Sequence, residues 1–208
     1  MNPVRIKFCG ITRAEDAMFA ASLGVEALGF VFTKRSRRFI EAVSASRIIR
    51  GLPPFVTCVA LFMDDEPAWI KQVIGVARPQ LLQFHGDESA ADCASYGVPY
   101  LKSVPMATVK DVASYAAGFS GAAGFLLDAN ASGEPGGQGA RFDWSHRPQL
   151  DRALILAGGL DADNVSEAIR SMRPFAVDVS SGIESGPGIK DAARMQAFVE
   201  AVRSPEHV

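Results

Sequence analysis

Two side chains in this sequence have the chemistry and the placement expected of a proton-transfer pair. Cys9 ends a short apolar run, and Asp128 ends another. A thiolate is a competent base when nearby positive charge lowers its pKa, and Lys7 and Arg38 are the candidate charges. A carboxyl group in apolar surroundings keeps its proton to higher pH, as a general acid at neutral pH requires. The pair predicts acid/base catalysis with Cys9 as the base and Asp128 as the acid.

Each of these residues also has an ordinary structural explanation. A single cysteine is usually a small buried apolar group, and an aspartate such as Asp128 can cap a helix or form a turn. Arg38 belongs to a basic cluster at 34–38, which could be a solvated loop or a clamp for a carboxylate. Position at the ends of apolar runs favours the functional interpretation.

Two small-residue loops could hold a phosphate. Gly158 and Gly159 follow one apolar run, and Ser181 and Gly182 follow the next. Backbone N–H groups in such loops, together with a helix N-terminus, bind anions without a basic side chain. Either loop alone could be no more than a tight turn, whereas two in succession predict a phosphate site. The segment 133–139 contains further glycines and could be a mobile lid or a disordered surface loop.

Two more polar residues are candidates for contact with a substrate. His85 could be a buried core histidine, a metal ligand or a substrate contact, but no second histidine lies at ligand spacing, so no metal site is expected. Asp178 could be a second carboxylate facing the site or a structural partner for Lys7 or another basic group. We expect a supporting role for Asp178.

Strands and helices alternate along the whole chain. Short apolar runs rich in β-branched residues lie at 4–9, 27–32, 57–62, 81–86, 100–104, 124–129, 153–159 and 176–181. Apolar residues recur at helical spacing at 14–23, 68–76, 109–117, 162–172 and 191–202. Eight such units without a linker predict one domain over 1–208, a closed parallel (β/α)₈ TIM barrel of the α/β class. A doubly wound open sheet is the alternative.

Strand alternation predicts which side chains enter the barrel. Along the first strand, Arg5, Lys7 and Cys9 should point inward and Val4, Ile6 and Phe8 outward toward the helices. The same rule turns these residues inward: Gln83, His85, Leu126, Asp128, Asp178 and Ser180. The polar ones end their strands at the carboxyl end, where barrels of this kind build active sites.

Local signals predict where several helices begin or end. Thr12 and Glu15 have the spacing of a capping box, and Asp161 precedes a helical run as an N-cap. Pro67 suits a first helical turn, and Gly24 suits the residue after a helix end.

Composition excludes several classes of partner. The 208 residues carry 21 basic and 23 acidic side chains, a net charge of -2, so no positive field would gather nucleic acid or an anionic membrane. The three cysteines, Cys9, Cys58 and Cys93, have no metal or redox spacing. No apolar stretch has the length of a signal peptide or a membrane span. We therefore expect a cytoplasmic enzyme.

Taken together, these motifs resemble those of the phosphoribosylanthranilate isomerases of tryptophan biosynthesis. The resemblance runs the full chain and is carried by Lys7-Phe-Cys-Gly-Ile-Thr12, Gly29-Phe-Val-Phe32, Ser36-Arg-Arg38, Gln83-Phe-His-Gly86, Leu127-Asp-Ala129, Gly136-Gly-Gln-Gly139, Phe142-Asp-Trp144, Gly158-Gly-Leu160 and Val177-Asp-Val-Ser-Ser-Gly182.

The resemblance implies a role for each part of the site. Cys9 matches the family's base, Asp128 its acid and Arg38 the group that holds the anthranilate carboxylate. The family's phosphate site corresponds to the backbone of the loops at 158–159 and 181–182, and its flexible loop to 136–139. Ala140 departs from the longer polar residue that many relatives carry, which leaves open how that loop closes.

The implied reaction is an Amadori rearrangement, an aldose–ketose isomerisation by general acid/base catalysis. It needs no metal, nucleotide or redox cofactor, because the anthranilate nitrogen serves as the electron sink. The expected partner is this small-molecule substrate alone, and the protein could be a monomer or a homodimer.

Two other functions fit the same features. The barrel could isomerise a different sugar phosphate, in histidine biosynthesis, but that chemistry uses two carboxylates and Cys9 stands where one of them would be. It could also be a phosphate-binding sensor without catalysis, which would bind the substrate and not turn it over.

Overall fold

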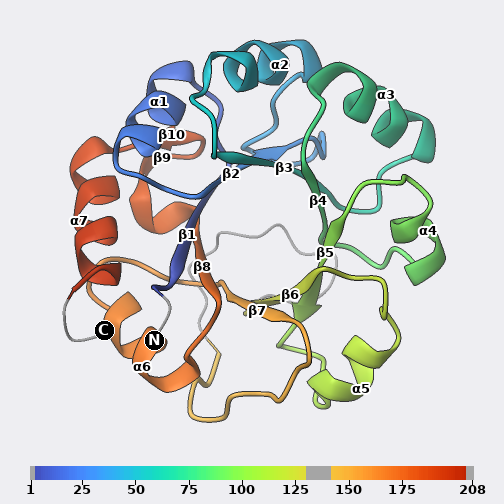
Figure 1. Ribbon diagram of the computed structural model, residues 1–208, viewed down its shortest axis with the longest axis vertical. Coiled ribbons are helices and arrows are strands. Elements are labelled where there is room, and N and C mark those ends of the chain that lie inside the picture. The colour runs from blue at the N-terminus through green and yellow to red at the C-terminus, as the bar shows by residue number, and fades with distance from the viewer. Residues whose placement is uncertain (1–2, 130–141, 205–208) are drawn as a thin grey trace.

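The eight predicted strands close into one parallel barrel, with helices outside it (Figure 1). This computed structural model describes residues 3–129 and 142–204. The barrel strands are β1 (Arg5–Cys9), β2 (Ala27–Val31), β3 (Thr57–Phe62), β4 (Leu81–Phe84), β5 (Tyr100–Pro105), β6 (Gly124–Asp128), β7 (Ala153–Leu156) and β8 (Ala176–Val179). They pair in chain order, and β8 pairs with β1 to complete the cylinder. The predicted fold class is confirmed, and the open sheet is excluded.

Helices follow most of the strands. They are α1 (Ala14–Ser22), α2 (Ala42–Gly51), α3 (Pro67–Ala77), α4 (Ala90–Ala94), α5 (Val112–Ala117), α6 (Val165–Met172) and α7 (Ala192–Val202). Between β6 and β7, the described residues 142–152 contain no helix. Between β8 and α7 the chain forms the 3₁₀ turn η1 (Ser181–Ile183) and a hairpin of β9 (Glu184–Gly186) and β10 (Ile189–Lys190).

Two of the four predicted helix ends are wrong. Arg13 precedes α1 without a side-chain cap, and the Thr12 hydroxyl donates instead to the carbonyl of Gly188 in the hairpin. Asp161 does not cap α6, which begins only at Val165; its carboxylate accepts from two backbone N–H groups in the turn before the helix.

The other two helix signals are confirmed. Pro67 is the first residue of α3, where its missing N–H costs no helical hydrogen bond. Gly24 follows the end of α1 with φ of 74°, a left-handed conformation that favours glycine.

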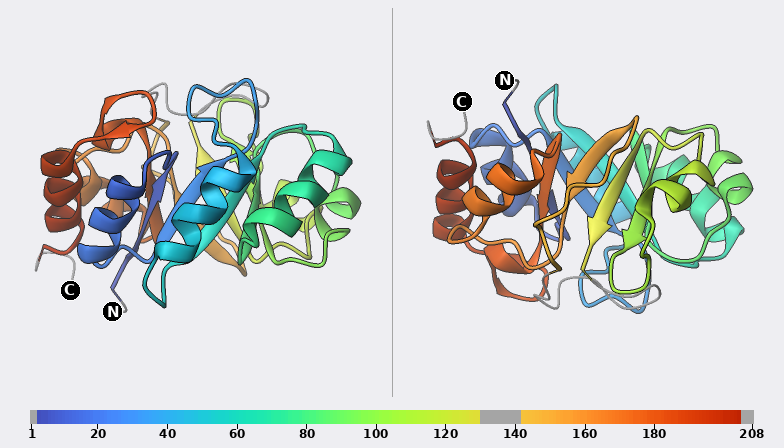
Figure 2. Two further views of the ribbon diagram at one scale, coloured as in Figure 1. Left: turned by 90° about the horizontal axis from the view of Figure 1, so that it is seen from above. Right: turned by 90° about the horizontal axis from the view of Figure 1, so that it is seen from below.

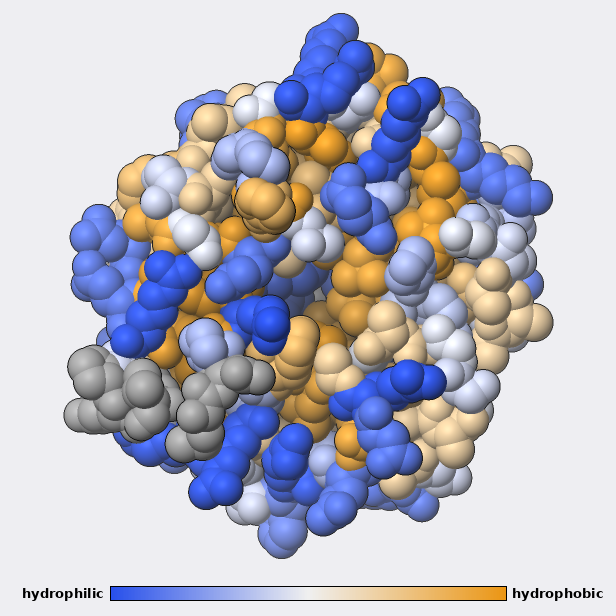
Figure 3. Space-filling model, in the orientation of Figure 1, coloured by the Kyte–Doolittle hydropathy of each residue, from blue (hydrophilic) through white to orange (hydrophobic). Residues whose placement is uncertain are grey.

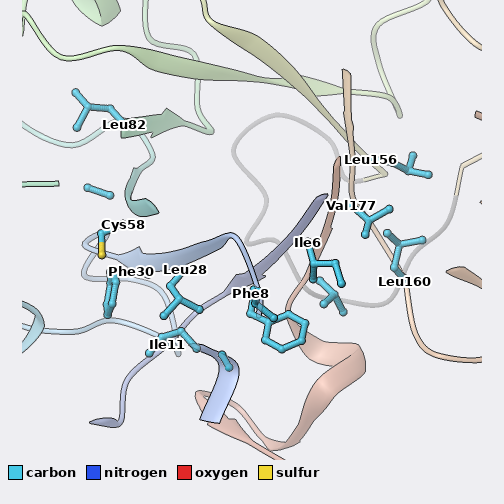
Figure 4. Packing of buried hydrophobic residues seen from close by; sticks show 14 of the residues in the cluster. Ile6, Phe8, Ile11, Leu28, Phe30, Cys58, Leu82, Leu156, Leu160 and Val177 are labelled. Atoms are coloured by element: carbon cyan, nitrogen blue, oxygen red, sulfur yellow. The ribbon is translucent and has the colours of Figure 1, made fainter. Parts of the chain in front are cut away.

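Apolar side chains form two separate layers. The larger lies between the strands and the helices, and Figure 4 shows Ile6, Phe8 and Leu28 among its buried side chains. There Phe8 meets Phe198 of α7 edge to face, with ring centroids 6.0 Å apart. The smaller layer fills the barrel and consists of Leu101, Leu126, Ile155, Ala157 and Ala176. The parity predicted for Ile6, Phe8 and Leu126 is therefore confirmed.

Arg5 departs from the predicted parity. Its side chain is exposed and lies over the ring of Phe175, 4.3 Å from the centroid, at the start of β8. A guanidinium at the amino end of the barrel can remain in water while it stacks on an aromatic ring, so it does not enter the apolar interior.

Several strands end earlier than the sequence predicts, which places polar residues in loops. β4 ends at Phe84, β7 at Leu156 and β8 at Val179, two or three residues short of the predicted ends. His85 and the two small-residue loops therefore follow the strands at the rim.

The left panel of Figure 2 shows the barrel from the side, and Figure 3 shows the face at the amino ends, where hydrophobic areas lie between hydrophilic ones. Among the described residues, no helix is long and apolar enough to cross a membrane.

Candidate active site

A cavity of about 770 Å³, open mouth included, lies at the carboxyl ends of the strands. Residues from nearly every strand of the barrel, or from the loop that follows it, line this cavity. They are Cys9, Val31, Thr33, Arg35, Ser36, Arg38, Leu61, Met63, Gln83, His85, Asp128, Ala157, Gly158, Gly159, Leu160, Asp178, Val179, Ser180 and Ser181. Eight of the nine predicted site residues are among them.

Cys9 is buried at the end of β1 and faces this cavity. A neighbouring glycine on β2 makes room for it: a Cβ at Gly29 would lie 2.8 Å from the Cys9 Sγ and 3.1 Å from the Lys7 Nζ. The thiol and the ammonium thus share a space that any larger residue at Gly29 would fill.

The surroundings of Cys9 act on its pKa in opposite directions. Burial raises the pKa of the thiol and outweighs the rest, while the Lys7 and Lys190 ammonium groups lower it and the Asp178 carboxylate raises it. The net direction is upward, which contradicts the lowered pKa that the sequence suggested. Lys7 is correctly predicted as a neighbouring charge, and Lys190 was missed.

Asp128 and His85 form a hydrogen-bonded pair across the cavity. The His85 Nε2 lies 3.2 Å from a carboxylate oxygen of Asp128. On the other side of the ring, Nδ1 lies 3.1 Å from the Ser103 hydroxyl and 3.4 Å from the Gln83 amide nitrogen. An amide nitrogen only donates, so Nδ1 accepts and the ring proton sits on Nε2, where it donates to Asp128. His85 therefore fixes the orientation of that carboxylate.

Arg38 reaches the rim across the end of β1. A Cβ at Gly10 would overlap the Arg38 side chain, so glycine beside Cys9 lets the arginine lie close to the thiol. Its guanidinium makes a two-point ion pair with Glu184 of β9: Nε and Nη2 donate over 2.8 and 2.7 Å. Arg38 of the basic cluster is thus a partly buried clamp, and the carboxylate that it holds here is supplied by the protein itself.

Asp178 pairs with Lys7 inside the barrel, as one of its predicted alternatives stated. The ammonium donates to a carboxylate oxygen over 2.8 Å, and both side chains are buried. The pair balances two charges directly beneath the thiol, and Asp178 also lines the cavity.

The two small-residue loops lie next to each other at the rim. Gly158 and Gly159 have φ of 85° and 63°, and a Cβ on Gly158 would lie 2.7 Å from the backbone nitrogen of Ala129. A Cβ on Gly182 would overlap the carbonyl of Leu160, so Gly182 allows the loops to touch. Gly182 is the one predicted site residue that does not line the cavity, and the closeness of Leu160 explains why a glycine is needed there.

Some functional signals lay beyond sequence reasoning. Glu184 and Lys190 belong to a hairpin that the sequence pattern did not predict, and Ser103 is not part of any motif identified in the sequence. The predicted lid at 133–139 and Ala140 lie outside the described residues. Within the described residues, no group of three or more histidine, cysteine, aspartate or glutamate side chains could hold a metal ion.

Known proteins resemble this chain over its full length. Residues 6–201 match the family model of N-(5′-phosphoribosyl)anthranilate (PRA) isomerase. The enzyme of that name from Pseudomonas aeruginosa is 51% identical over 205 residues, covering 98% of this chain and 97% of the relative. The crystal structure of phosphoribosyl anthranilate isomerase from Thermotoga maritima superposes with a TM-score of 0.87 at 38% identity, covering 96% of this chain and 98% of that one.

A second solved structure, also of a phosphoribosyl anthranilate isomerase, is a complex with a ligand. It is described as a complex with reduced 1-(o-carboxyphenylamino)-1-deoxyribulose 5-phosphate, has a TM-score of 0.82 and 37% identity, and covers 96% of this chain and 98% of that one. Identity above one half to a full-length relative, with the same barrel, leaves one assignment: this chain belongs to the N-(5′-phosphoribosyl)anthranilate isomerase family.

Proposed function

We propose that this protein isomerises N-(5′-phosphoribosyl)anthranilate to 1-(2-carboxyphenylamino)-1-deoxyribulose 5-phosphate, the reaction for which its family is named. The observation that carries the proposal is one cavity that brings together Cys9, Asp128 and Arg38, from β1, β6 and the loop after β2. Membership of the family supports the same substrate, and the ligand complex of a relative supports a small-molecule substrate.

The acid step belongs to Asp128. Protonation of the furanose ring oxygen opens the ring and leaves a Schiff base between C1′ and the anthranilate nitrogen. His85 holds the Asp128 carboxyl group through a 3.2 Å contact, and orientation of this kind limits the directions from which the proton can be delivered. Because a general acid donates a proton, the mechanism requires that Asp128 is protonated when the substrate binds.

The base step belongs to Cys9. The thiolate removes the proton on C2′, and the electron pair moves through the Schiff base to the nitrogen, giving an enolamine that tautomerises to the ketose. Lys7 and Lys190 favour the thiolate by charge. The substrate receives one proton from Asp128 and gives up one proton to Cys9, so the molecule as a whole is neither oxidised nor reduced.

Two ends of the substrate need anchors. The loops at Gly158, Gly159 and Ser181 offer backbone N–H groups to the phosphate at the rim. Around the closed barrel the strands follow one another as β7, β8, β1 and β2, so Arg38, in the loop after β2, and these loops lie on opposite sides of β1. We assign Arg38 to the anthranilate carboxylate. With both ends held, C2′ is placed near the thiol.

The test is a turnover assay with freshly prepared N-(5′-phosphoribosyl)anthranilate, whose anthranilate-linked fluorescence falls as it is converted. Addition of purified protein should accelerate the fall in proportion to protein concentration. Binding without an accelerated fall would support the non-catalytic sensor instead. Turnover of the histidine-pathway sugar phosphate at a comparable kcat/KM would point to the broader isomerase.

Four further expectations accompany the activity. We propose that residues 1–208 act as one catalytic domain, which predicts a single cooperative unfolding transition. The protein should be a monomer or a homodimer in light scattering, should leave added nucleic acid and vesicles unbound, and should fractionate with the cytoplasm. A second transition, a larger assembly or recovery with membranes would refute the corresponding part.

A further inference from the structure

Lys190 is a buried lysine whose side chain bonds to the end of β1, to the end of β8 and to the hairpin that follows β8. Its Nζ donates to the backbone carbonyl of Cys9 over 2.5 Å, to the carbonyl of Ser180 over 3.1 Å and to a carboxylate oxygen of Glu184 over 2.9 Å. The first two partners are the last residue of β1 and the residue that follows β8. One ammonium thus ties together two strand ends at the rim of the cavity.

Glu184 links this ammonium to Arg38. One of its oxygens accepts from the Nε of Arg38 and from Lys190, and the other accepts from the Nη2 of Arg38. Its backbone carbonyl accepts from Arg194 of α7, which fixes the strand that carries it. The guanidinium plane is therefore held from the side of the hairpin.

We propose that Lys190 and Glu184 are positioning residues for the isomerisation: Lys190 sets the place and charge environment of Cys9, and Glu184 sets the plane of Arg38. This inference rests on the proposed function, in which Cys9 is the base and Arg38 binds the carboxylate. It adds two residues of the hairpin after β8 to the working parts of the site.

The charge balance favours this role over simple stabilisation. Lys7 and Asp178 face Cys9 from β1 and β8 as a neutral pair, and Gly29 of β2, next to the thiol, carries no charge. The hairpin and the loop after β2 add two cations, Lys190 and Arg38, and one anion, Glu184. Among these five charged side chains the cations outnumber the anions by one.

Burial of charged groups opposes folding, and a buried ion pair is often no more stable than apolar residues of the same size. A buried ammonium bonded to the backbone carbonyl of Cys9 is therefore better explained by the thiolate whose charge it would balance. Burial lowers the pKa of Lys190, so keeping its side chain charged costs free energy.

Lys102 provides a matched control elsewhere in the molecule. It is equally buried, donates to the backbone carbonyl of Gly86 and pairs with Glu88 over 2.9 Å, but it makes no bond to Cys9, unlike Lys190. Lys102→Met and Lys190→Met each remove one buried ammonium of the same bonding pattern. Only Lys190→Met should change the properties of Cys9.

The first measurement needs no substrate. Thiolate absorbance of the folded protein is titrated with pH, and the curve of Cys9→Ser is subtracted to isolate Cys9 from Cys58 and Cys93. Lys190→Met should raise the Cys9 midpoint by about one pH unit, the effect of removing an opposite charge a few ångströms away. Lys190→Arg should restore most of the shift, and Lys102→Met should leave the midpoint in place.

The second measurement is steady-state kinetics. Lys190→Met should lower kcat about tenfold near neutrality and move the lower limb of the kcat–pH profile upward by the same one unit, with KM changed less than about threefold. Glu184→Gln should instead raise KM about tenfold with a smaller change in kcat, because a loosened guanidinium weakens carboxylate binding.

The outcomes distinguish a failure of the inference about Lys190 from a failure of the proposal that Cys9 is the base. If Lys190→Met lowers the melting temperature as Lys102→Met does and leaves the Cys9 midpoint and the pH profile unchanged, Lys190 is only structural and the inference is wrong. If Lys190→Met does not fold, Lys190→Gln keeps an N–H donor, removes the charge and must show the same shift. A shifted midpoint in a protein whose Cys9→Ser variant is fully active would instead refute the proposed base.

Discussion

The lower and upper halves of the barrel interior have opposite character although the same strands build both. Leu126, Ile155 and Ala176 fill the lower half with buried apolar side chains. Two residues further along β6 and β8 stand Asp128 and Asp178, both lining the cavity. One strand thus contributes to the core and then to the site, because alternate residues face the same way. Stability and chemistry should therefore be separable by mutation along a single strand.

The largest effect should come from the upper half. Asp128→Asn removes the proposed acid and keeps its size, so kcat should fall about 10²–10⁴-fold. The far-ultraviolet circular dichroism and the melting temperature should change little. Asp111→Asn is the control, since Asp111 caps α5 and does not line the cavity. Activity of Asp128→Asn near that of the parent would remove Asp128 from the mechanism.

The lower half should respond in the opposite manner. Leu126→Ala deletes a fully buried side chain two residues before Asp128, and should lower the free energy of unfolding by about 2–5 kcal/mol. Urea denaturation measures the loss. Below the transition kcat should stay within about threefold of the parent, and a hundredfold loss in kcat would show that the two halves are not separable.

A smaller effect is expected at the phosphate loops. Gly158→Ala forces an L side chain into a left-handed conformation, at a cost of about 1–2 kcal/mol, and places its Cβ against Ala129. KM should rise about tenfold, with kcat less affected. Gly75→Ala in α3 is the matched control, because its Cβ meets no atom within 4 Å. Its KM should be unchanged, and equal KM values for both variants would argue against a phosphate role.

The smallest effect concerns acid. Hydrogen bonds and charge from Arg38 and Lys190 lower the pKa of Glu184 below its ordinary 4.5 despite burial. A depressed carboxyl pKa stabilises the fold above its unfolded-state value, and this contribution is lost as pH falls below about 4.5 and through the folded-state pKa. Urea midpoints measured from neutral to acidic pH should fall less steeply below about pH 4.5 in Glu184→Gln than in the parent. Parallel curves would contradict this assignment.

The sequence predicted the barrel well because its signals were local and repeated. Each apolar run had to become a strand buried on both faces, and alternation then assigned Lys7, Cys9 and Asp128 to the inside. Helix ends were harder, because they depend on distant partners: Thr12 would cap α1 by spacing alone, yet its hydroxyl bonds to Gly188. A competing acceptor 176 residues away leaves no local trace.

The structure brings the predicted site residues together around one cavity, but the sequence pointed to only some of the groups that surround them. Cys9, Asp128 and Arg38 were identifiable by residue type at strand ends. Glu184 and Lys190 were not, because their effect arises only when the hairpin folds back to the end of β1. The pKa of Cys9 was misjudged for the same reason, since the extent of burial is a property of the closed barrel and not of neighbouring residues.

The central claim is that the Cys9 thiol removes the substrate proton, and Cys9→Ser tests it most directly. A serine hydroxyl fills nearly the same space and is a far weaker base at neutral pH. Steady-state kinetics with N-(5′-phosphoribosyl)anthranilate should show kcat lower by at least about a hundredfold, with KM within about threefold of the parent. An unchanged kcat, or a loss carried entirely by KM, would contradict the account.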